Sequence, residues 1–146
     1  MIAVFRLGTL RSLLILFLFT SEIAIGRPIT ISAISNLNFS TAVQGDGILV
    51  VPPGTRENRA NASFFVRGAP NVTYTIILPT SAKLAVRKGP IKDTIMLTAF
   101  TSFPSNVGLL NLLGFQFLYV GATRAAIRNN QLTGSYSGSF SVTVVY

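Results

Sequence analysis

Residues 134–146 read Gly-Ser-Tyr-Ser-Gly-Ser-Phe-Ser-Val-Thr-Val-Val-Tyr, with serine or threonine between the larger side chains over most of the stretch. Successive side chains of a β-strand point to opposite faces, so this period of two predicts a strand with one face buried and one in water. One-sided burial is typical of antiparallel sheets. The predicted pairing edge of this strand consists of Gly134, Tyr136, Phe140, Val142, Val144 and Tyr146.

Shorter runs of the same kind fill the rest of the chain, separated by clusters of Gly, Pro, Asn and Ser. Near the start, Ile29, Ile31 and Ala33 alternate with hydroxyl residues, and the run 73–78 is the strongest strand pattern in the middle. About seven to nine short strands with frequent turns predict a single all-β domain over residues 27–146. They favour an immunoglobulin-like, pilin-like antiparallel β-sandwich.

Residues 1–26 have the pattern of a secretory signal peptide. Arg6 and Arg11 precede an apolar run, and Ala24 and Gly26 stand at the −3 and −1 positions of a plausible cleavage site. The apolar run is shorter than the roughly 20 residues of a membrane span. We therefore expect an exported protein of the periplasm, cell surface or extracellular space, without a membrane span after cleavage. An uncleaved membrane anchor is the alternative.

The whole chain carries a net charge of +8, and removal of residues 1–26 lowers it to +7. A positive charge with so few acids favours attraction to anionic surfaces such as acidic glycans or lipopolysaccharide. The alternative is that scattered Lys and Arg residues keep exposed strand edges from aggregating. The basic segment 87–92 lacks aromatic neighbours, which argues against a nucleic-acid partner.

The composition excludes most catalytic chemistry. The chain has no histidine and no cysteine, so histidine-dependent triads, thiolate nucleophiles and disulfides cannot form. Beyond residue 26 the only carboxylates are Asp46, Glu57 and Asp93; the first two fall in predicted loops, and the third is interpreted as a strand-edge partner of Lys92. We expect no enzyme activity, no metal site and no cofactor.

One segment, 122–130, has a pattern that also suits a short helical turn. Arg124 and Arg128 are four residues apart, so they are expected to share a face in a helix or in a strand.

Four segments together resemble an uncharacterised bacterial secreted family related to spore coat protein U-like domains and to subunits of archaic chaperone–usher pili. They are residues 34–39 (Ile-Ser-Asn-Leu-Asn-Phe), 61–71, 74–79 (Tyr-Thr-Ile-Ile-Leu-Pro) and the alternating stretch 134–146. The resemblance implies an immunoglobulin-like sandwich with a structural or adhesive role at the cell surface, and no cofactor or catalytic residue.

In chaperone–usher subunits the sandwich lacks one strand, and a segment of a neighbour fills the gap by β-strand addition. The resemblance therefore implies that Phe140, Val142, Val144 and Tyr146 point inward beside such a gap, with Gly134 opening the strand. It also implies a periplasmic chaperone and a homo-polymer as partners, with Ile29, Ile31 and Ala33 as a possible donor segment.

Three hypotheses follow. The first is an assembling structural or adhesive subunit, pilus-like or coat-like, whose strand edges are completed by a partner. The second is a self-complete surface-binding module for an anionic glycan or lipopolysaccharide. The third, a small outer-membrane barrel, is disfavoured because the runs are shorter than the roughly 9–11 residues of a spanning strand.

Overall fold

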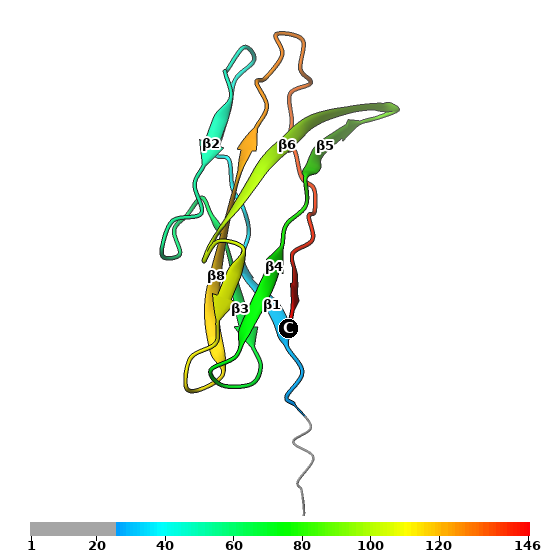
Figure 1. Ribbon diagram of the computed structural model, residues 1–146. Coiled ribbons are helices and arrows are strands. Elements are labelled where there is room, and N and C mark those ends of the chain that lie inside the picture. The colour runs from blue at the N-terminus through cyan, green and yellow to red at the C-terminus, as the bar shows by residue number, and fades with distance from the viewer. Residues whose placement is uncertain (1–25) are drawn as a thin grey trace, which may run out of the picture.

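Nine β-strands and no helix make up the part of the chain that the computed structural model describes, residues 26–146 (Figure 1). The strands are β1 (Thr30–Ser35), β2 (Leu49–Val51), β3 (Ala62–Arg67), β4 (Thr73–Ile77), β5 (Ser81–Lys88), β6 (Ile91–Phe103), β7 (Val107–Leu109), β8 (Phe115–Arg124) and β9 (Thr143–Val145). All their pairings are antiparallel, which confirms the prediction of an antiparallel all-β chain. Apart from Gly26, the predicted signal peptide lies outside the described residues.

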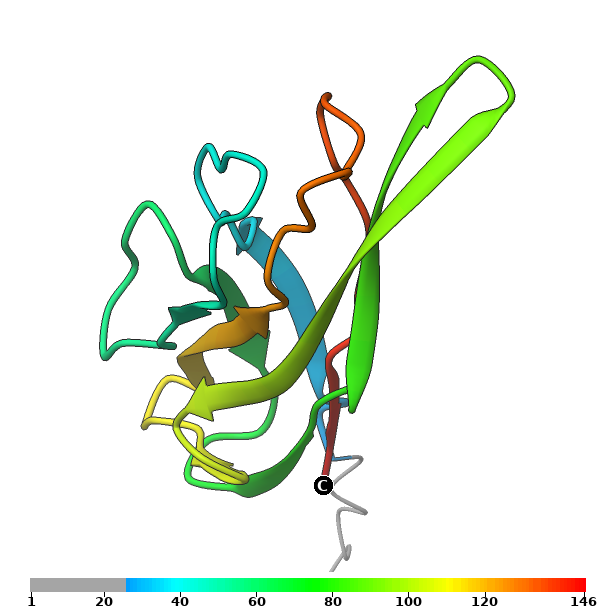
Figure 2. The same cartoon turned by 90° about the horizontal axis from the view of Figure 1, so that it is seen from above.

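The larger of two sheets has the strand order β1-β3-β8-β6-β5. Its central strand, β8, pairs with β3 over residues 115–120 and with β2 over residues 122–124. The opposite edge of β8 pairs with β6. Seen from above, the sheet curls into a half-barrel and is not a flat layer (Figure 2).

Strand β6 is long because it serves two partners. Its first part pairs with β5 from Ile91 to Thr98, and its later part pairs with β8 up to Phe103. The register with β8 shifts between Thr98 and Thr101, where Ala99 has a positive φ of 47°. Such an irregularity bends a strand. The β5–β6 hairpin therefore leans away from the rest of the molecule (Figure 2).

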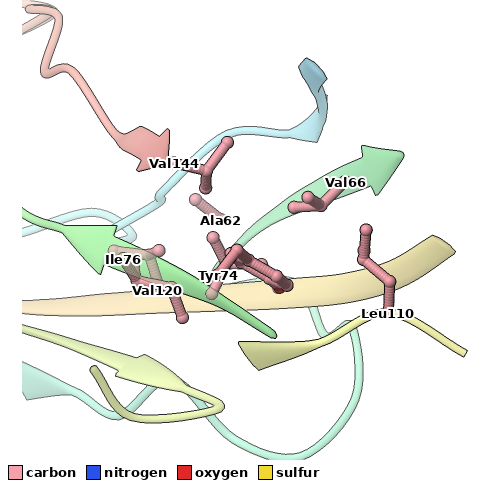
Figure 3. Close-up of a cluster of buried hydrophobic side chains, with 8 residues drawn as sticks. Ala62, Val66, Tyr74, Ile76, Leu110, Val120 and Val144 are labelled. Carbon is pink, nitrogen blue, oxygen red and sulfur yellow. The ribbon is translucent and has the colours of Figure 1, made fainter. Parts of the chain in front are cut away.

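The smaller sheet, β7-β4-β9, packs against the inner face of the large sheet. Alternate residues of β4, Tyr74 and Ile76, are buried, and Val144 of β9 joins them. From the large sheet, β3 and β8 contribute buried side chains to the same cluster (Figure 3). This main core cluster consists of Ala62, Val66, Tyr74, Ile76, Leu110, Leu118, Val120 and Val144.

The C-terminal stretch differs from the single long strand that its alternation predicts. Only residues 143–145 form a strand, and Ser137 makes one isolated bridge to Ala85 of β5. Phe140 and Val142 still pack against the main core cluster, and Ser141 between them is exposed. Alternation fixes which side chains face the core, but a strand also needs a neighbouring strand to pair with, and residues 138–142 have none in the described chain.

Candidate functional site

The candidate site is a groove of about 1060 Å³ inside the curl of the large sheet. One side of it is formed by the end of β1 and the segment 36–44. The other side is formed by β5 and the C-terminal segment 131–140. Its floor includes Phe64 of β3, Leu97 of β6 and Arg124 of β8.

The first side of the groove is the free edge of β1. Within residues 26–146 this strand pairs with β3 alone, from Thr30 opposite Arg67 to Ser35 opposite Ser63. The structure therefore places the predicted donor segment in its own sheet. Ile29 and Ile31 are half-buried against the main core cluster, whereas Ala33 is exposed and lines the groove.

The second side is the C-terminal segment, which touches β5 at one point. The Ala85–Ser137 bridge has N···O distances of 2.8 and 3.0 Å. Gly138 follows, and a Cβ placed on it would lie 2.1 Å from the carbonyl oxygen of Lys83, so only glycine allows this close approach. Gly134 opens the segment with φ 154°.

Aromatic side chains connect the C-terminal segment to the groove floor. The Phe140 ring lies with its centroid 5.2 Å from that of Phe100 and 6.2 Å from that of Phe64. Beyond it, Val142 packs on the main core cluster and Val144 is buried. The apolar floor thus continues from the groove into the core of the molecule.

Tyr146 does not lie in the groove, although its place in the alternation predicts an inward position. Its side chain is 53% exposed. The hydroxyl accepts a hydrogen bond from the Ala69 backbone N–H at 2.7 Å and donates one to the Arg27 carbonyl oxygen at 2.9 Å. Tyr146 thereby joins the end of β9 to the segment that leads into β1.

A polar cluster holds the beginning of the C-terminal segment onto β6. The Leu132 backbone N–H donates to Asp93 Oδ2 at 2.9 Å, and Arg128 forms an ion pair with the same carboxylate. The Tyr136 hydroxyl lies 2.8 Å from the Leu132 carbonyl oxygen and 3.3 Å from Asp93 Oδ2. Asp93 therefore anchors segment 128–136, and the prediction that it pairs with Lys92 is wrong. The sequence does not reveal this role, because the partners of Asp93 lie 35–43 positions away.

The pKa of Asp93 is lowered, and the largest cause is the hydrogen bond from the Leu132 N–H. Desolvation opposes this effect, while the Thr94 N–H, the charge of Arg128 and the Tyr136 hydroxyl also lower the pKa. Each of these donors or charges favours the ionised carboxylate. The cluster is thus arranged around a charged Asp93.

Arg124 lines the groove at the end of β8 and is only 5% exposed. Its Nη2 donates to the Gly47 carbonyl oxygen at 2.9 Å, and Nε has no hydrogen-bond partner among residues 26–146. The expectation that Arg124 and Arg128 share a face is wrong, because β8 ends at Arg124 and the chain then leaves the sheet. Arg128 is exposed beside Asp93.

The geometry suits the binding of an extended polypeptide better than chemistry on a small molecule. The groove has an apolar floor between two lengths of backbone that lack a strand neighbour on the groove side. In residues 26–146 no three His, Cys, Asp or Glu side chains gather as a potential metal site. That same part of the chain forms no apolar helix long enough to cross a membrane.

Residues 29–146 match the model of a protein family described as a domain of unknown function, DUF4402. The match covers all nine strands, and only residues 26–28 of the described chain lie outside it. No curated protein and no solved structure matches the chain.

Proposed function

The chain belongs to the DUF4402 family, and from this premise we propose that it is an exported, non-catalytic structural or adhesive subunit, pilus-like or coat-like, that acts by β-strand pairing. In this proposal the curled large sheet and the small sheet act as an immunoglobulin-like, pilin-like sandwich that lacks one strand. A partner supplies that strand by inserting an extended segment into the groove.

The observation that carries the proposal is the pair of unpaired edges on the two sides of one groove. Within residues 26–146 no strand lies between the free edge of β1 and residues 138–142, and in the latter segment the half-buried Phe140 and Val142 alternate with exposed serines. Unpaired edges readily pair with another chain. A segment with alternating apolar residues would place those residues on the floor near Phe64 and Phe140, as in β-strand addition.

The protein's own N-terminal segment already occupies a place in the fold. Ile31 packs on the main core cluster, and β1 makes a five-residue register with β3. For residues 29–33 to serve a neighbouring copy, this pairing would have to open first. An inserted segment from another molecule, such as a periplasmic chaperone or a neighbouring subunit, leaves β1 in place.

Site-specific cross-linking tests the proposal, since a chain without cysteine allows single labelling positions. Ala33→Cys and Ser139→Cys line the groove, and Ser32→Cys is the matched control because Ser32 points to the opposite face of β1. Each cysteine is labelled with a benzophenone maleimide on the exported protein in its own cells and is then photo-cross-linked. We expect positions 33 and 139 to form adducts with one extended segment of another molecule. Exported protein without such adducts, or with equal adducts at 32, overturns the proposal.

One observation favours the second function, binding of an anionic glycan or lipopolysaccharide. The projecting β5–β6 hairpin carries four exposed cations, and Arg87 lies directly opposite Lys92 in the register. Like charges opposite each other destabilise a strand pair, and a bound polyanion would offset their repulsion. The four cations are Lys83, Arg87, Lys88 and Lys92.

A charge reversal distinguishes this second function. Arg87→Glu should weaken salt-sensitive retention on heparin, used as the probe polyanion, because it removes one cation and pairs another with an acid. Arg59→Glu, in the exposed loop after β2, makes the same change in net charge and should keep more retention. Equal losses for both variants would mean that only net charge matters, and the hairpin would not be a binding site.

A further inference from the structure

Arg124 is the last residue in a row of buried side chains on the inner face of the central strand, and the residues before it in this row are apolar. Alternate residues of β8, from Leu118 through Val120 and Ala122, are buried and apolar. The next position of that face is Arg124, which is also buried. Its neighbours across the sheet are Leu49 on β2 and Leu97 on β6, both of them leucines.

The guanidinium of Arg124 has little within the described chain to compensate its charge. Gly47 supplies one carbonyl oxygen, and Nε is buried without an acceptor. The nearest acid in sequence to Gly47 is Asp46, whose Oδ2 instead accepts the Val43 backbone N–H. The one ion pair among residues 26–146 is that of Asp93 with Arg128.

A buried cation without a counter-charge is unfavourable, and an arginine presents a planar fork of donors that suits a carboxylate. Arg124 lines the groove in which, in the proposed function, the partner strand binds. Placed where β8 ends, beside the apolar floor residues, it marks one position along the groove where an acidic group would be preferred over an apolar one.

We infer that Arg124 is an anion-recognition residue of the groove, and that the segment that completes the fold carries a carboxylate at this position. This inference rests on the proposed function and adds the chemistry of the partner to it. The carboxylate comes either from an Asp or Glu side chain or from a free C-terminus, since the guanidinium binds both in the same way.

The inference also identifies what kind of partner fits. Residues 26–42 of this chain contain no Asp or Glu, so the predicted donor segment, residues 29–33 of a second copy, would bring no carboxylate to Arg124. The acids of the described chain are Asp46, Glu57 and Asp93. Asp46 and Glu57 lie in loops without alternating apolar residues, and Asp93 follows the cation Lys92 in β6. The stretch that leads to the C-terminal carboxylate of a second copy is already in use, because β9 pairs with β4 in its own fold. The partner strand therefore comes from a different polypeptide.

Peptide binding tests the inference. The probes are peptides of roughly ten residues, long enough to span the groove as a strand, with alternating Val and Ser and one Trp. One series carries Glu at each position in turn with an amidated C-terminus, a second carries Gln at the same places, and a third carries Gln and a free C-terminal carboxylate. The protein has no tryptophan, so the fluorescence of the peptide reports binding directly.

We expect the peptide with Glu at one particular position, or the peptide with the free C-terminus, to bind at least about tenfold more tightly than the amidated Gln peptide. The reason is that a charge-assisted hydrogen-bonded pair is strong in a shielded site. Arg124→Met should abolish that difference and leave binding of the Gln peptides in place. Arg124→Gln is the second variant, because its amide can still donate to the Gly47 carbonyl oxygen. Arg59→Met, which removes an exposed cation from the loop after β2 outside the groove, is the control and should keep the preference.

The outcomes separate the two ideas. Gln and Glu peptides that bind equally well, and that protect a cysteine at position 33 from labelling, would overturn the role of Arg124 and leave the strand-accepting groove standing. A carboxylate preference that persists in Arg124→Met and Arg124→Gln would also overturn it. If no peptide of any series protects position 33, the strand-accepting function fails, and the inference fails with it.

Discussion

Asp93 is the residue that fixes the start of the C-terminal segment. It receives the Leu132 backbone N–H and the Arg128 guanidinium from a part of the chain that is otherwise a loop. Gln131, buried beside it, donates to the Tyr136 hydroxyl at 3.0 Å. The groove side that contains residues 134–140 is therefore positioned by one carboxylate.

The pH dependence of stability should reflect this role. Because the native pKa of Asp93 is lowered, the unfolded state binds its proton more readily, and the stabilisation is present above the unfolded pKa of about 4 and lost as the pH falls below it. Asp93→Asn should reduce the fall in unfolding free energy between about pH 5 and pH 2, measured by urea unfolding. Glu57→Gln, in an exposed loop, is the control; an Asp93→Asn profile that parallels the wild type would contradict this role.

Gly138 is a second single residue on which the groove depends. Gly138→Ala would place a Cβ 2.1 Å from the Lys83 backbone oxygen, so the segment must move away from β5. We expect a loss of roughly 1–3 kcal/mol in unfolding free energy, as for other overpacked sites. Gly47→Ala, where nothing lies within 4 Å of the added carbon, should cost less than half as much. Thermal and urea unfolding measure both, and equal losses would show that Gly138 is not a contact point.

At the scale of elements, the C-terminal segment and β9 form one stretch with two kinds of backbone. Residues 143–145 pair with β4, while residues 138–142 pair with nothing in the described chain. Amide hydrogens in a strand ladder are protected from exchange, and unpaired ones are not. The stretch should therefore separate into a fast and a slow part.

Hydrogen exchange of the free protein measures this difference. We expect the amides of residues 139–142 to exchange within the fastest class, and those of β3 and β8, which pair over residues 62–67 and 115–120, within the slowest. A bound strand-forming peptide should move residues 139–142 into the protected class. Slow exchange at 139–142 in the free monomer would contradict the unpaired edge.

The sequence predicted the strands better than it predicted their neighbours. The run 73–78 corresponds to β4, and the alternating residues 29–33 overlap β1, because β-branched residues between turn residues are sufficient to indicate a strand. The period of two in residues 134–146 correctly assigned Phe140 and Val144 to the core side. It could not show that residues 138–142 have no strand beside them among residues 26–146, since pairing depends on distant parts of the chain.

The groove itself was less predictable. Ala33 and Phe140 were singled out from alternation, yet the segment 36–44 and Arg124 join them only through the curl of the large sheet. Arg124 and Arg128 have the same residue type and a regular spacing, and their different surroundings arise from the end of β8 between them. A carboxylate such as Asp93 likewise shows its role only when its distant partners are in place.

At the scale of the whole molecule, Tyr74 of the small sheet connects the two sheets. It is 2% exposed, and its hydroxyl donates to Gln116 Oε1 of β8 at 2.9 Å. Gly108 on β7 makes room for its ring, since a Cβ there would lie 2.2 Å from the ring carbon that bears the hydroxyl. Ionisation of this buried phenol would therefore affect the packing of both sheets.

Alkaline unfolding tests this connection. Burial raises the pKa of Tyr74 to about 12, so the native state holds this proton more tightly than the unfolded state. The stability that depends on the protonated phenol is complete below about pH 10 and is lost as the pH rises toward 12. Tyr74→Phe should make this loss of stability with rising pH smaller, as measured by circular dichroism. Tyr146→Phe, at an exposed position, is the control and should retain it.

The position of β8 also determines when the protein can fold. β8 is the central strand, with β3 and β2 on one edge and β6 on the other, but it is made from residues 115–124. At a synthesis rate of roughly 5–20 residues per second, β2 exists for several seconds before its partner emerges. For that interval the β1–β3 pair, β2 and the β5–β6 hairpin lack the central strand that joins them into one sheet. A chain that is delivered from its N-terminus must therefore be kept from aggregating until residue 124 has appeared.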